Sequence, residues 1–210
     1  MYVPKINQEH DQERIFDFIH KNSFAALVSS NNNVPTATHI PIELAFDANN
    51  APILRGHVAK ANPHWQLWKQ PSQALVIFTG AHSYISSSWY EKTNVSTWNY
   101  LAVHVSGEIR IVDEETLYES LKALTNKYEK YQDKPLYFEQ LGEDDIRKQM
   151  RGIVGFEIRV AHIDAKAKLS QNRNDKDYAH IVEKLKETDD FQAHDVADEM
   201  GKRRPLSDIR

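Results

Sequence analysis

Strand-like segments follow one another at short spacing before the longest helical pattern of this chain begins, and that order limits the folds it can adopt. A doubly wound sheet alternates strands with helices, whereas consecutive strands are typical of antiparallel barrels and sandwiches. The sequence therefore predicts a mainly β protein of the α+β class, an antiparallel β-barrel with peripheral helices. The expected strands are residues 24–29, 34–46, 53–58, 73–79, 98–112 and 153–163.

Three local signals refine the expected strands. The asparagines at 31–33 predict a hairpin turn, because Asn tolerates left-handed backbone and bonds its own main chain. Pro35 and Pro41 have no N–H to donate to a neighbouring strand, so each predicts an edge or a bulge. Gly107 predicts a bulge or a close backbone contact within the long fifth strand.

Helical patterns precede the first strand, follow the fifth strand and fill the tail. Asp11 is the expected N-cap of the first helix, and Asp113 is the expected cap of the longest one. In the tail, helices are expected at residues 177–186 and 191–200. Gly201 is the expected C-terminal stop of the last helix.

Length and charge set limits on the organisation and partners of the chain. The 210 residues, 40% of them hydrophobic, suffice for one domain with a core or one domain plus an appendage. We expect a barrel domain at residues 1–165 and a C-terminal helical extension, packed on the barrel, at 166–210. The formal net charge of −4 gives no global field that would attract nucleic acid.

The cellular compartment is inferred from what the sequence lacks. It has no cysteine, which excludes disulfides, thiolate nucleophiles and Cys-based zinc sites and fits a reducing compartment. The N-terminus has no apolar signal region, and no run approaches eighteen apolar residues. We therefore expect a cytoplasmic protein without a membrane segment.

The stretch from Ala81 to Tyr100 combines flat aromatic rings with small polar groups. It holds two Trp, three Tyr, five Ser, two Thr, two Asn and one His, and no Leu, Met or Phe. Trp and Tyr pair a large apolar face with a polar tip, and the other residues add directional donors and acceptors. Such a set suits a pocket for a planar ligand with polar edges, although a twisted strand pair with hydroxyl-rich turns has the same composition.

Lys60 and Asn62 lie where a predicted strand meets a short helix that opens with Pro63. Helix N-terminal amides beside a lysine form a site for an anion such as phosphate. An ordinary strand–helix turn with a solvated lysine has the same sequence. Both interpretations stay open at this point.

The segment KLSQNR at residues 168–173 holds a base, a hydroxyl, two amides and a guanidinium within six residues. This set could clamp the polar edge or the phosphate of a ligand. A helix N-cap with exposed charges has the same pattern and is the simpler interpretation.

Several chemistries lack their usual motifs. No HExxH motif accompanies the strand histidines, no GxSxG marks a hydrolase, and no GxGxxG or P-loop marks a nucleotide site. We therefore expect no metal site and assign no catalytic residue. The histidines in or beside predicted strands are His39, His57, His82 and His104.

One short basic run, Lys202 to Arg204, lies near the C-terminus. It could touch a nucleic-acid backbone, but most such runs are solvated tails, and no helix-turn-helix accompanies it. Direct binding to nucleic acid is therefore doubtful, and we expect any binding to be weak and lost as salt rises.

Seven motifs occur in order along residues 1 to about 180. They are MYVP at 1–4, ATHIPIEL at 37–44, RGHVAKANPHW at 55–65, ALVIFTGAHSYISSSWY at 74–90, STWNYLAVHVSGEIRIVD at 96–113, IVGFEIRV at 153–160 and KLSQNR at 168–173. In this order the chain resembles the PaiB-type FMN-binding family, a branch of the flavin-binding split-barrel proteins. The motifs are specific together, and no single one would be.

The resemblance implies an antiparallel split β-barrel of the FMN-binding type, a homodimer with FMN in clefts at the subunit interface. It implies that Lys60 and Asn62 hold the phosphate, that three aromatic residues wall the isoalloxazine and that three polar residues bond its edges. The aromatic residues are Trp89, Trp98 and Tyr100, and the polar residues are Ser170, Gln171 and Asn172.

Three positions depart from the family's pattern. Ser87 and Ser96 stand where the family usually has proline, and Ala167 stands where an aromatic residue is common. A looser pocket rim at these positions would lower the affinity for FMN.

The resulting hypothesis is an FMN-binding split-barrel protein, either a flavin-dependent redox enzyme of unknown substrate or a flavin-responsive regulator. The second role follows from the family's description as negative transcriptional regulators. No general acid or base stands out, as expected where the flavin carries the chemistry. The alternatives are a DNA-binding repressor without flavin chemistry and a haem-binding or haem-degrading split barrel that uses a histidine.

Overall fold

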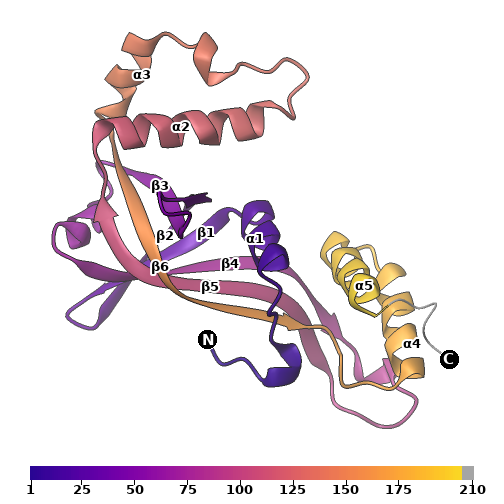
Figure 1. Ribbon diagram of the computed structural model, residues 1–210. Helices are drawn as coiled ribbons and strands as arrows, with labels where there is room; N and C mark the ends of the chain where they lie inside the picture. The colour runs from indigo at the N-terminus through magenta and orange to yellow at the C-terminus, as the bar shows by residue number, and fades with distance from the viewer. Residues whose placement is uncertain (205–210) are drawn as a thin grey trace. The chain divides into compact units, whose positions relative to one another are not determined.

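The computed structural model describes residues 1–204, and within them six strands form a closed barrel (Figure 1). The strand order around the barrel is β1-β2-β3-β6-β5-β4. β1 pairs antiparallel with β2 and β4, and β3 pairs antiparallel with β2 and β6. The prediction of a mainly β, antiparallel barrel is thus confirmed. The strands are β1 (Phe24–Asn31), β2 (Val34–Phe46), β3 (Pro52–Ala59), β4 (Ser72–Ile85), β5 (Thr97–Ile111) and β6 (Ile153–Lys168).

The helices begin at the side chains that the sequence indicated. Asp11 Oδ1 accepts from the backbone N–H of Glu13 at 3.0 Å, and Asp113 Oδ1 accepts from that of Thr116 at 2.8 Å. The α-helices are α1 (Gln12–Lys21), α2 (Glu114–Glu129), α3 (Glu143–Met150), α4 (Asp175–Lys186) and α5 (Phe191–Arg203). Short 3-10 helices are η1 (Lys5–Asn7), η2 (Pro63–Trp68), η3 (Ser87–Trp89) and η4 (Phe138–Gln140).

The stop predicted at Gly201 is wrong, because α5 continues through it to Arg203. The side chains of Lys202 and Arg203 both reach back to Glu199, and these ion pairs at i, i+3 and i, i+4 stabilise the last turn. An isolated glycine within a helix is tolerated at a cost of about 1 kcal/mol.

The turn and strand signals agree with the structure. Asn32 and Asn33 have φ angles of 49° and 64°, the left-handed backbone expected for the hairpin turn. Residues 34–41 of β2, which include both prolines, pair with β1, and residues 42–46 pair with β3. A Cβ added to Gly107 would lie 1.9 Å from the carbonyl oxygen of Arg159, so the predicted close backbone contact is confirmed.

Two strands extend five or six residues past their predicted C-terminal ends. β4 continues to Ile85, and β6 continues to Lys168. In β4 the buried positions change phase at Gly80 and Ala81, and the alternation then resumes with Ser83 and Ile85 buried and Tyr84 exposed between them. The first part of the aromatic stretch is therefore strand, and KLSQNR begins at a strand end.

The chain divides into two compact units, which are described separately below. Unit 1 comprises Met1–Phe18, Thr79–Val103 and Asp164–Arg210, and unit 2 comprises Ile19–Phe78 and His104–Ile163. β4, β5 and β6 each contribute residues to both units. The domain division expected at residues 165 and 166 stays a prediction, and residues 205–210 of that expected extension lie outside the described residues.

Each unit has its own buried cluster. In unit 1, α4 and α5 contact each other and pack on strand residues such as Leu101 and Ala167. Burial raises the pKa of the Tyr178 hydroxyl to about 12, and that hydroxyl donates to the Met200 carbonyl at 2.8 Å. In unit 2, α2, η4 and α3 bury the side chains of Leu117, Phe138, Ile146 and Met150.

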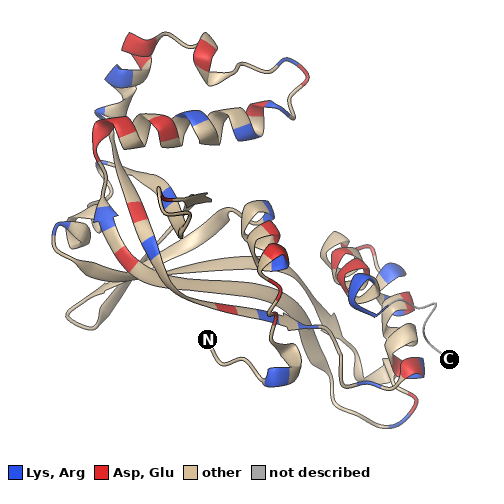
Figure 2. Cartoon of the chain, viewed as in Figure 1, with Lys and Arg blue, Asp and Glu red and all other residues tan. Residues whose placement is uncertain are grey.

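Charged residues are concentrated on the helices, and the strands carry few (Figure 2). Each of α2, α3, α4 and α5 carries both acidic and basic side chains. Within residues 1–204, none of these four helices therefore presents the single-sign basic stripe that is typical of a nucleic-acid footprint. No helix in the described part of the chain is long and apolar enough to cross a membrane.

Candidate functional site

The segment predicted to bind polar ligand edges lines a cavity of about 260 Å³ in unit 1, which we call the polar cavity. It brings together Ser170, Gln171 and Asn172, all three of the polar site residues predicted from the sequence. The cavity lies between the C-terminal end of β6, the N-terminal end of β5 and η1. The lining residues are Ile6, Asn7, Val95, Ser96, Thr97, Asn99, Lys168, Ser170, Gln171, Asn172 and Arg173.

Ser170 is held in the cavity wall by Asn99, a residue that the sequence interpretation missed. Asn99 is fully buried, its Nδ2 donates to Ser170 Oγ at 3.0 Å, and Ser170 Oγ donates to Asn99 Oδ1 at 3.1 Å. Ser170 has a φ of 60°, a left-handed conformation that side chains other than Gly and Asn rarely adopt. The reciprocal pair therefore fixes a turn that the backbone alone would not favour. The sequence did offer a signal for Asn99: it lies between Trp98 and Tyr100, at a position of the strand that alternation places on the buried side.

Gln171 folds back on its own strand rather than into open space. Its Oε1 accepts from the backbone N–H of Leu169 at 2.7 Å, and its Nε2 donates to the carbonyl oxygen of Ala167. The side-chain amide thus pins the turn, while Asn172 beside it is exposed. Of the three predicted polar residues, Asn172 has the side chain most accessible to a ligand.

The polar cavity carries two cations, Lys168 and Arg173. Lys168 Nζ donates to Thr97 Oγ1. The Arg173 guanidinium lies over the ring of Tyr90 at 4.6 Å, and its Nε is buried without a hydrogen-bond partner in the described structure. Among residues 1–204, no carboxylate lines this cavity. Its walls therefore offer positive charge, hydroxyls and amides to a ligand.

The structure separates the three aromatic residues that were expected to form one wall. Trp98 and Tyr100 alternate with the buried Asn99 and Leu101 along β5, so they share the opposite, outward face. Trp98, 52% exposed, lies 6.1 Å from the ring of His82 and 6.0 Å from that of Tyr84.

Trp89 lies elsewhere in unit 1. It packs against the buried cluster that contains Leu101, on the other side of β5 from Trp98 and Tyr100. Its carbonyl oxygen is 2.9 Å from His180 Nδ1 on α4. The assignment of the three aromatic residues to a flavin stays a prediction, but only two of them share a surface within one chain.

The positions that depart from the family's pattern fall in different environments. Ser96 lines the polar cavity, and Ser87 lies in η3. Ala167 is buried in the apolar cluster beneath α4 and α5. The change at Ala167 therefore bears on core packing, and Ser96 is the departure that lies on a cavity wall.

Asn62 of unit 2 has a clear role within its own chain. Its Oδ1 accepts from the backbone N–H of His64 at 3.0 Å, capping η2, and its Nδ2 donates to Thr38 Oγ1 at 3.1 Å. Thr38 Oγ1 also contacts His64 Nδ1 at 2.9 Å. His64 is buried, and that burial lowers its pKa. The Asn62 amide thus has one N–H left for any ligand.

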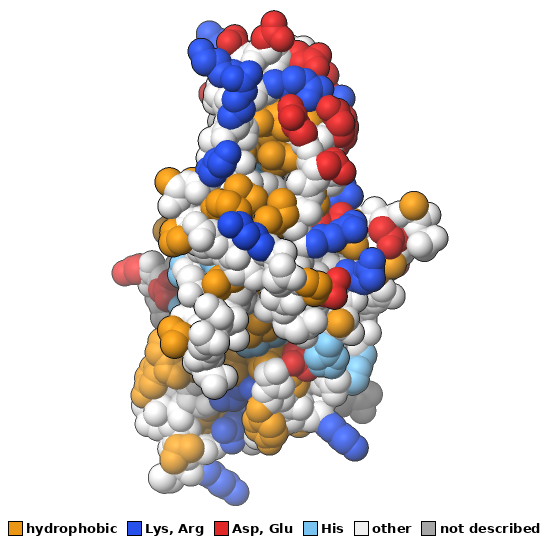
Figure 3. All heavy atoms as spheres, turned by 90° about the vertical axis from the view of Figure 1, so that its left-hand side faces the viewer, with side chains coloured by type: hydrophobic (Ala, Val, Ile, Leu, Met, Phe, Trp, Pro, Cys, Tyr) orange, Lys and Arg blue, Asp and Glu red, His pale blue; other side chains and the backbone are white. Residues whose placement is uncertain are grey.

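Lys60 lines a second cavity, of about 380 Å³, which we call the unit 2 cavity. This cavity contains carboxylates as well as cations. Arg147 pairs with Glu143, Glu114 and Glu115, and those bonds raise its pKa. Figure 3 shows hydrophobic side chains between charged ones in the region of α2 and α3. The lining residues are Lys60, Val112, Asp113, Glu114, Leu117, Arg147, Met150, Arg151 and Ile153.

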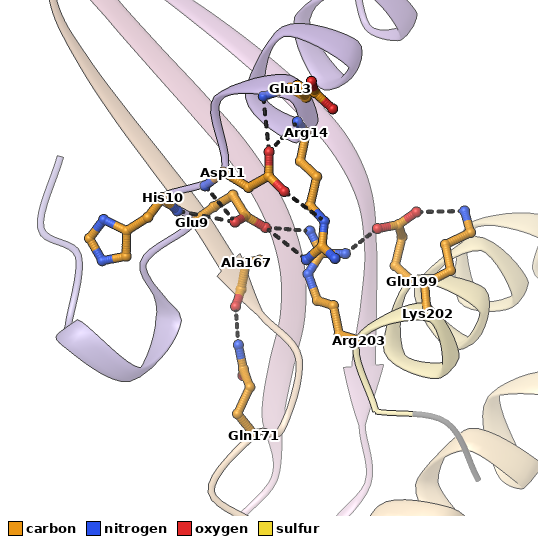
Figure 4. Close-up of polar contacts among 10 residues, drawn as sticks. All are labelled: Glu9, His10, Asp11, Glu13, Arg14, Ala167, Gln171, Glu199, Lys202 and Arg203. Atoms are coloured by element: carbon orange, nitrogen blue, oxygen red, sulfur yellow. Dashed lines mark hydrogen bonds and ion pairs between the residues drawn. The ribbon is translucent and has the colours of Figure 1, made fainter. Parts of the chain in front are cut away.

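The basic run near the C-terminus is engaged in ion pairs (Figure 4). Arg203 Nη2 contacts Glu9 Oε2 at 3.0 Å and also pairs with Glu199, which in turn binds Lys202 at 2.8 Å. Arg204 pairs with Asp175 of α4. The run is therefore neither a solvated tail nor a free basic patch.

Among residues 1–204, no group of three or more His, Asp or Glu side chains is placed to hold a metal ion. The strand histidines differ from one another: burial lowers the pKa of His57, and His82 lies beside Trp98 at the surface.

Comparison with known proteins gives one family and one fold. The family model described as "Putative FMN-binding domain" matches residues 1–162. The chain is 39% identical over 201 residues to the Bacillus subtilis protein "Protease synthase and sporulation protein PAI 2", which spans 95% of this chain and 96% of that protein.

Two solved structures share the fold. The FAD and haem binding protein from Mycobacterium smegmatis has a TM-score of 0.63 at 18% identity, covering 82% of this chain and 79% of that one. The flavocytochrome Anf3 from Azotobacter vinelandii has a TM-score of 0.57 at 16% identity, covering 85% and 78%. At such identities the likeness concerns the fold.

Proposed function

This chain belongs to the FMN-binding domain family, and from that premise we propose that it binds FMN and functions as a flavin-dependent redox enzyme or a flavin-responsive regulator. When bound, the flavin would supply the electron-transfer chemistry, and the protein would supply binding, orientation and electrostatics. A cytoplasmic location is part of this proposal.

The observation that carries the proposal is the donor set of the polar cavity. A flavin mononucleotide has a phosphate and a ring edge rich in acceptors, both of which need donors and positive charge. The cavity offers Lys168, Arg173 with its unpartnered Nε, and the exposed amide of Asn172. Trp98 and Tyr100 do not line this cavity and lie on the face of β5 opposite to Asn99, so we propose them as a separate wall for the flavin ring. These residues fit the group, and we propose that they bind and orient it.

The partner that we propose is a second copy of this chain. Along the paired registers of β1, β2 and β4, the outward side chains are mostly apolar and partly exposed, with Phe24 67% exposed. A contiguous apolar sheet face of this kind is typical of an interaction surface. The face comprises Phe24, Ala26, Val28, Ala37, Pro41, Leu75 and Ile77, with the exposed His39 between Ala37 and Pro41. We expect a dimer in sedimentation; a stable monomer of 24.3 kDa would refute this part of the proposal.

The absorbance spectrum of the purified protein tests the cofactor. We expect flavin bands, and release of the cofactor followed by chromatography should give FMN rather than FAD. Reconstitution with FMN should restore the bands after stripping. A protein that shows no flavin bands and does not take up FMN would overturn the proposal.

Haem binding is a second candidate because one structural neighbour is named as an FAD and haem binding protein and the other as a flavocytochrome. His82, exposed beside Trp98, is the histidine of unit 1 best placed to face a flat ligand. A Soret band on addition of hemin, lost in His82→Ala, would favour this candidate over the flavin.

The repressor alternative has less support from the described structure. Lys202, Arg203 and Arg204 are paired with carboxylates, so few free cations are available to phosphates. We expect no specific complex in a mobility-shift assay at near-physiological salt. A nanomolar complex on one operator that resists nonspecific DNA would make the repressor the better hypothesis.

A further inference from the structure

We infer that the polar cavity of unit 1 is an anion site that takes a phosphate monoester, with Lys168 and Arg173 supplying its charge. The inference moves the phosphate away from Lys60, where the family resemblance had placed it. It rests on the proposed function only for the identity of the molecule that carries the phosphate. That the cavity binds an anion is argued from its own lining residues.

The two cations of the cavity, Lys168 and Arg173, meet no carboxylate in its described lining, and Arg173 lies over the ring of Tyr90. Lys168 binds a neutral hydroxyl, that of Thr97, and the Arg173 Nε has no hydrogen-bond partner among the described atoms. Two like charges at one small cavity repel each other unless an anion joins them. A phosphate monoester, which carries close to two negative charges at neutral pH, balances them.

The neutral groups of the cavity match the same ligand. Ser96, Thr97 and Asn172 add hydroxyl and amide donors to the two cations. The wall is held in place before any ligand arrives, since buried Asn99 bonds Ser170 twice and Gln171 bonds the backbone of Ala167 and Leu169 just before the turn. A preorganised set of donors around positive charge is what phosphate recognition requires.

The size of the cavity selects part of a ligand rather than a whole one. Its volume of about 260 Å³ lies below the roughly 300–1,000 Å³ of sites that enclose a complete drug-sized molecule. The cavity therefore suits the phosphorylated end of a larger compound. That compound is either FMN itself or a separate phosphorylated substrate, and both present the same phosphate monoester.

The unit 2 cavity lacks this imbalance. Its Arg147 is already bound to three glutamates, and Asp113 and Glu114 line the same space as Lys60. An anion entering there would meet carboxylates as well as cations. The polar cavity is therefore the stronger of the two sites for phosphate.

Calorimetric titration tests the inference. The full-length chain is first stripped of any flavin and is then titrated with inorganic phosphate, FMN and riboflavin. Lys168→Gln should weaken inorganic phosphate by about 10- to 100-fold, the loss expected for one charge-assisted bond. Lys60→Gln should leave phosphate binding unchanged. Lys92→Gln is the matched control, since Lys92 is an exposed lysine of unit 1 that lines neither cavity.

The three ligands distinguish the sources of the phosphate. If Lys168→Gln weakens FMN but not riboflavin, the cavity holds the phosphate of FMN. If the wild-type chain binds phosphate through Lys168 but takes no flavin, the proposed function fails and the anion site stands, with another phosphorylated compound as its ligand.

Unchanged phosphate and FMN binding in Lys168→Gln would overturn the inference. A loss of FMN but not riboflavin in Lys60→Gln would do so too, because it would place the phosphate in the unit 2 cavity. Should Lys168→Gln fail to fold, Asn172→Asp provides the second variant: it adds a carboxylate at an exposed position of the cavity and should weaken phosphate at least tenfold, with Asn172→Ala as its uncharged control. Equal affinities in Asn172→Asp and Asn172→Ala would likewise refute the site.

Discussion

The polar cavity of unit 1 contains a lysine and an arginine, and the unit 2 cavity contains a lysine and two arginines, but their charges are used differently. In unit 2 the three glutamates bound to Arg147 come from the first turns of α2 and α3, where acidic residues also stabilise the helix N-termini. In unit 1 the described lining has no carboxylate, and its polar side chains instead bond the backbone and one another. The comparison teaches that a cation becomes a binding group only where the fold does not already neutralise it.

The largest effect should come from removing the support of the polar cavity. Asn99→Ala leaves the buried hydroxyl of Ser170 without its partner, which costs about 1–3 kcal/mol. In a chain of this length the melting temperature should fall by roughly 2–4 °C for each kcal/mol. Because Asn99 acts through Ser170, phosphate affinity should fall with it.

Asn94→Ala is the control for this prediction, because Asn94 Oδ1 bonds only the neighbouring N–H of Val95 at 2.8 Å among the described contacts. Its melting temperature and phosphate affinity should match those of the wild type. An Asn99→Ala protein with unchanged stability and unchanged phosphate binding would show that the wall of the cavity needs no such support.

The next prediction tries to turn the unit 2 cavity into an anion site. The combined substitution Glu114→Gln, Glu115→Gln and Glu143→Gln frees Arg147 beside Lys60 and Arg151. Calorimetry should then detect a gain in phosphate affinity of about tenfold or more, equivalent to about 1.4 kcal/mol. The melting temperature should fall slightly, because each lost helix N-terminal charge contributes about 0.3–1 kcal/mol. No gain in phosphate binding would show that ion pairing is not what separates the two cavities.

A smaller effect concerns the backbone of the polar cavity. Ser170→Ala and Ser170→Gly both remove the hydroxyl, but only glycine adopts a φ of 60° without strain. Left-handed backbone costs other residues about 1–2 kcal/mol. Ser170→Gly should therefore be more stable than Ser170→Ala by about 1 kcal/mol in denaturant unfolding. Equal stabilities would mean that the turn relaxes when the bond to Asn99 is lost.

The strands and helix starts could be predicted from sequence because their causes are local. Strand alternation, the Asn32–Asn33 turn and the caps at Asp11 and Asp113 each depend on a few neighbouring residues. The ends of the strands were harder to predict from sequence. β6, for example, continues past residue 163, where Lys166 pairs with Gln8 of the N-terminal segment. That pairing joins residues far apart in the chain.

The candidate site could be predicted only in part, because its geometry depends on distant partners. Ser170 and Asn99 are 71 residues apart, and nothing in KLSQNR indicates that Gln171 folds back on its own backbone. The composition of the aromatic stretch could not predict on which face of the strand each ring lies, since that depends on where β5 begins. Once Thr97 is its first residue, Trp98 faces outward and Trp89 packs with the buried cluster.

The smallest effect separates the units by acid sensitivity. Burial lowers the pKa of both His57 and His64, two histidines of unit 2, from their ordinary value of 6.5. Above pH 6.5 these histidines are neutral in the folded and unfolded chains. Below it, the unfolded chain takes up protons that the folded chain does not, so the free energy of unfolding should decrease as pH falls toward the lowered pKa.

Urea unfolding across this pH range, followed by Trp fluorescence, measures the effect, because Trp68 lies 5.1 Å from the His64 ring. His64→Gln should flatten the decrease in stability below pH 6.5, whereas His20→Gln, at an exposed position of α1 in unit 2, should leave it unchanged. If the free energies of unfolding of His64→Gln and the wild type decrease with the same slope below pH 6.5, the His64 imidazole takes up its proton equally in the folded and unfolded chains. The acid sensitivity of unit 2 then has another source.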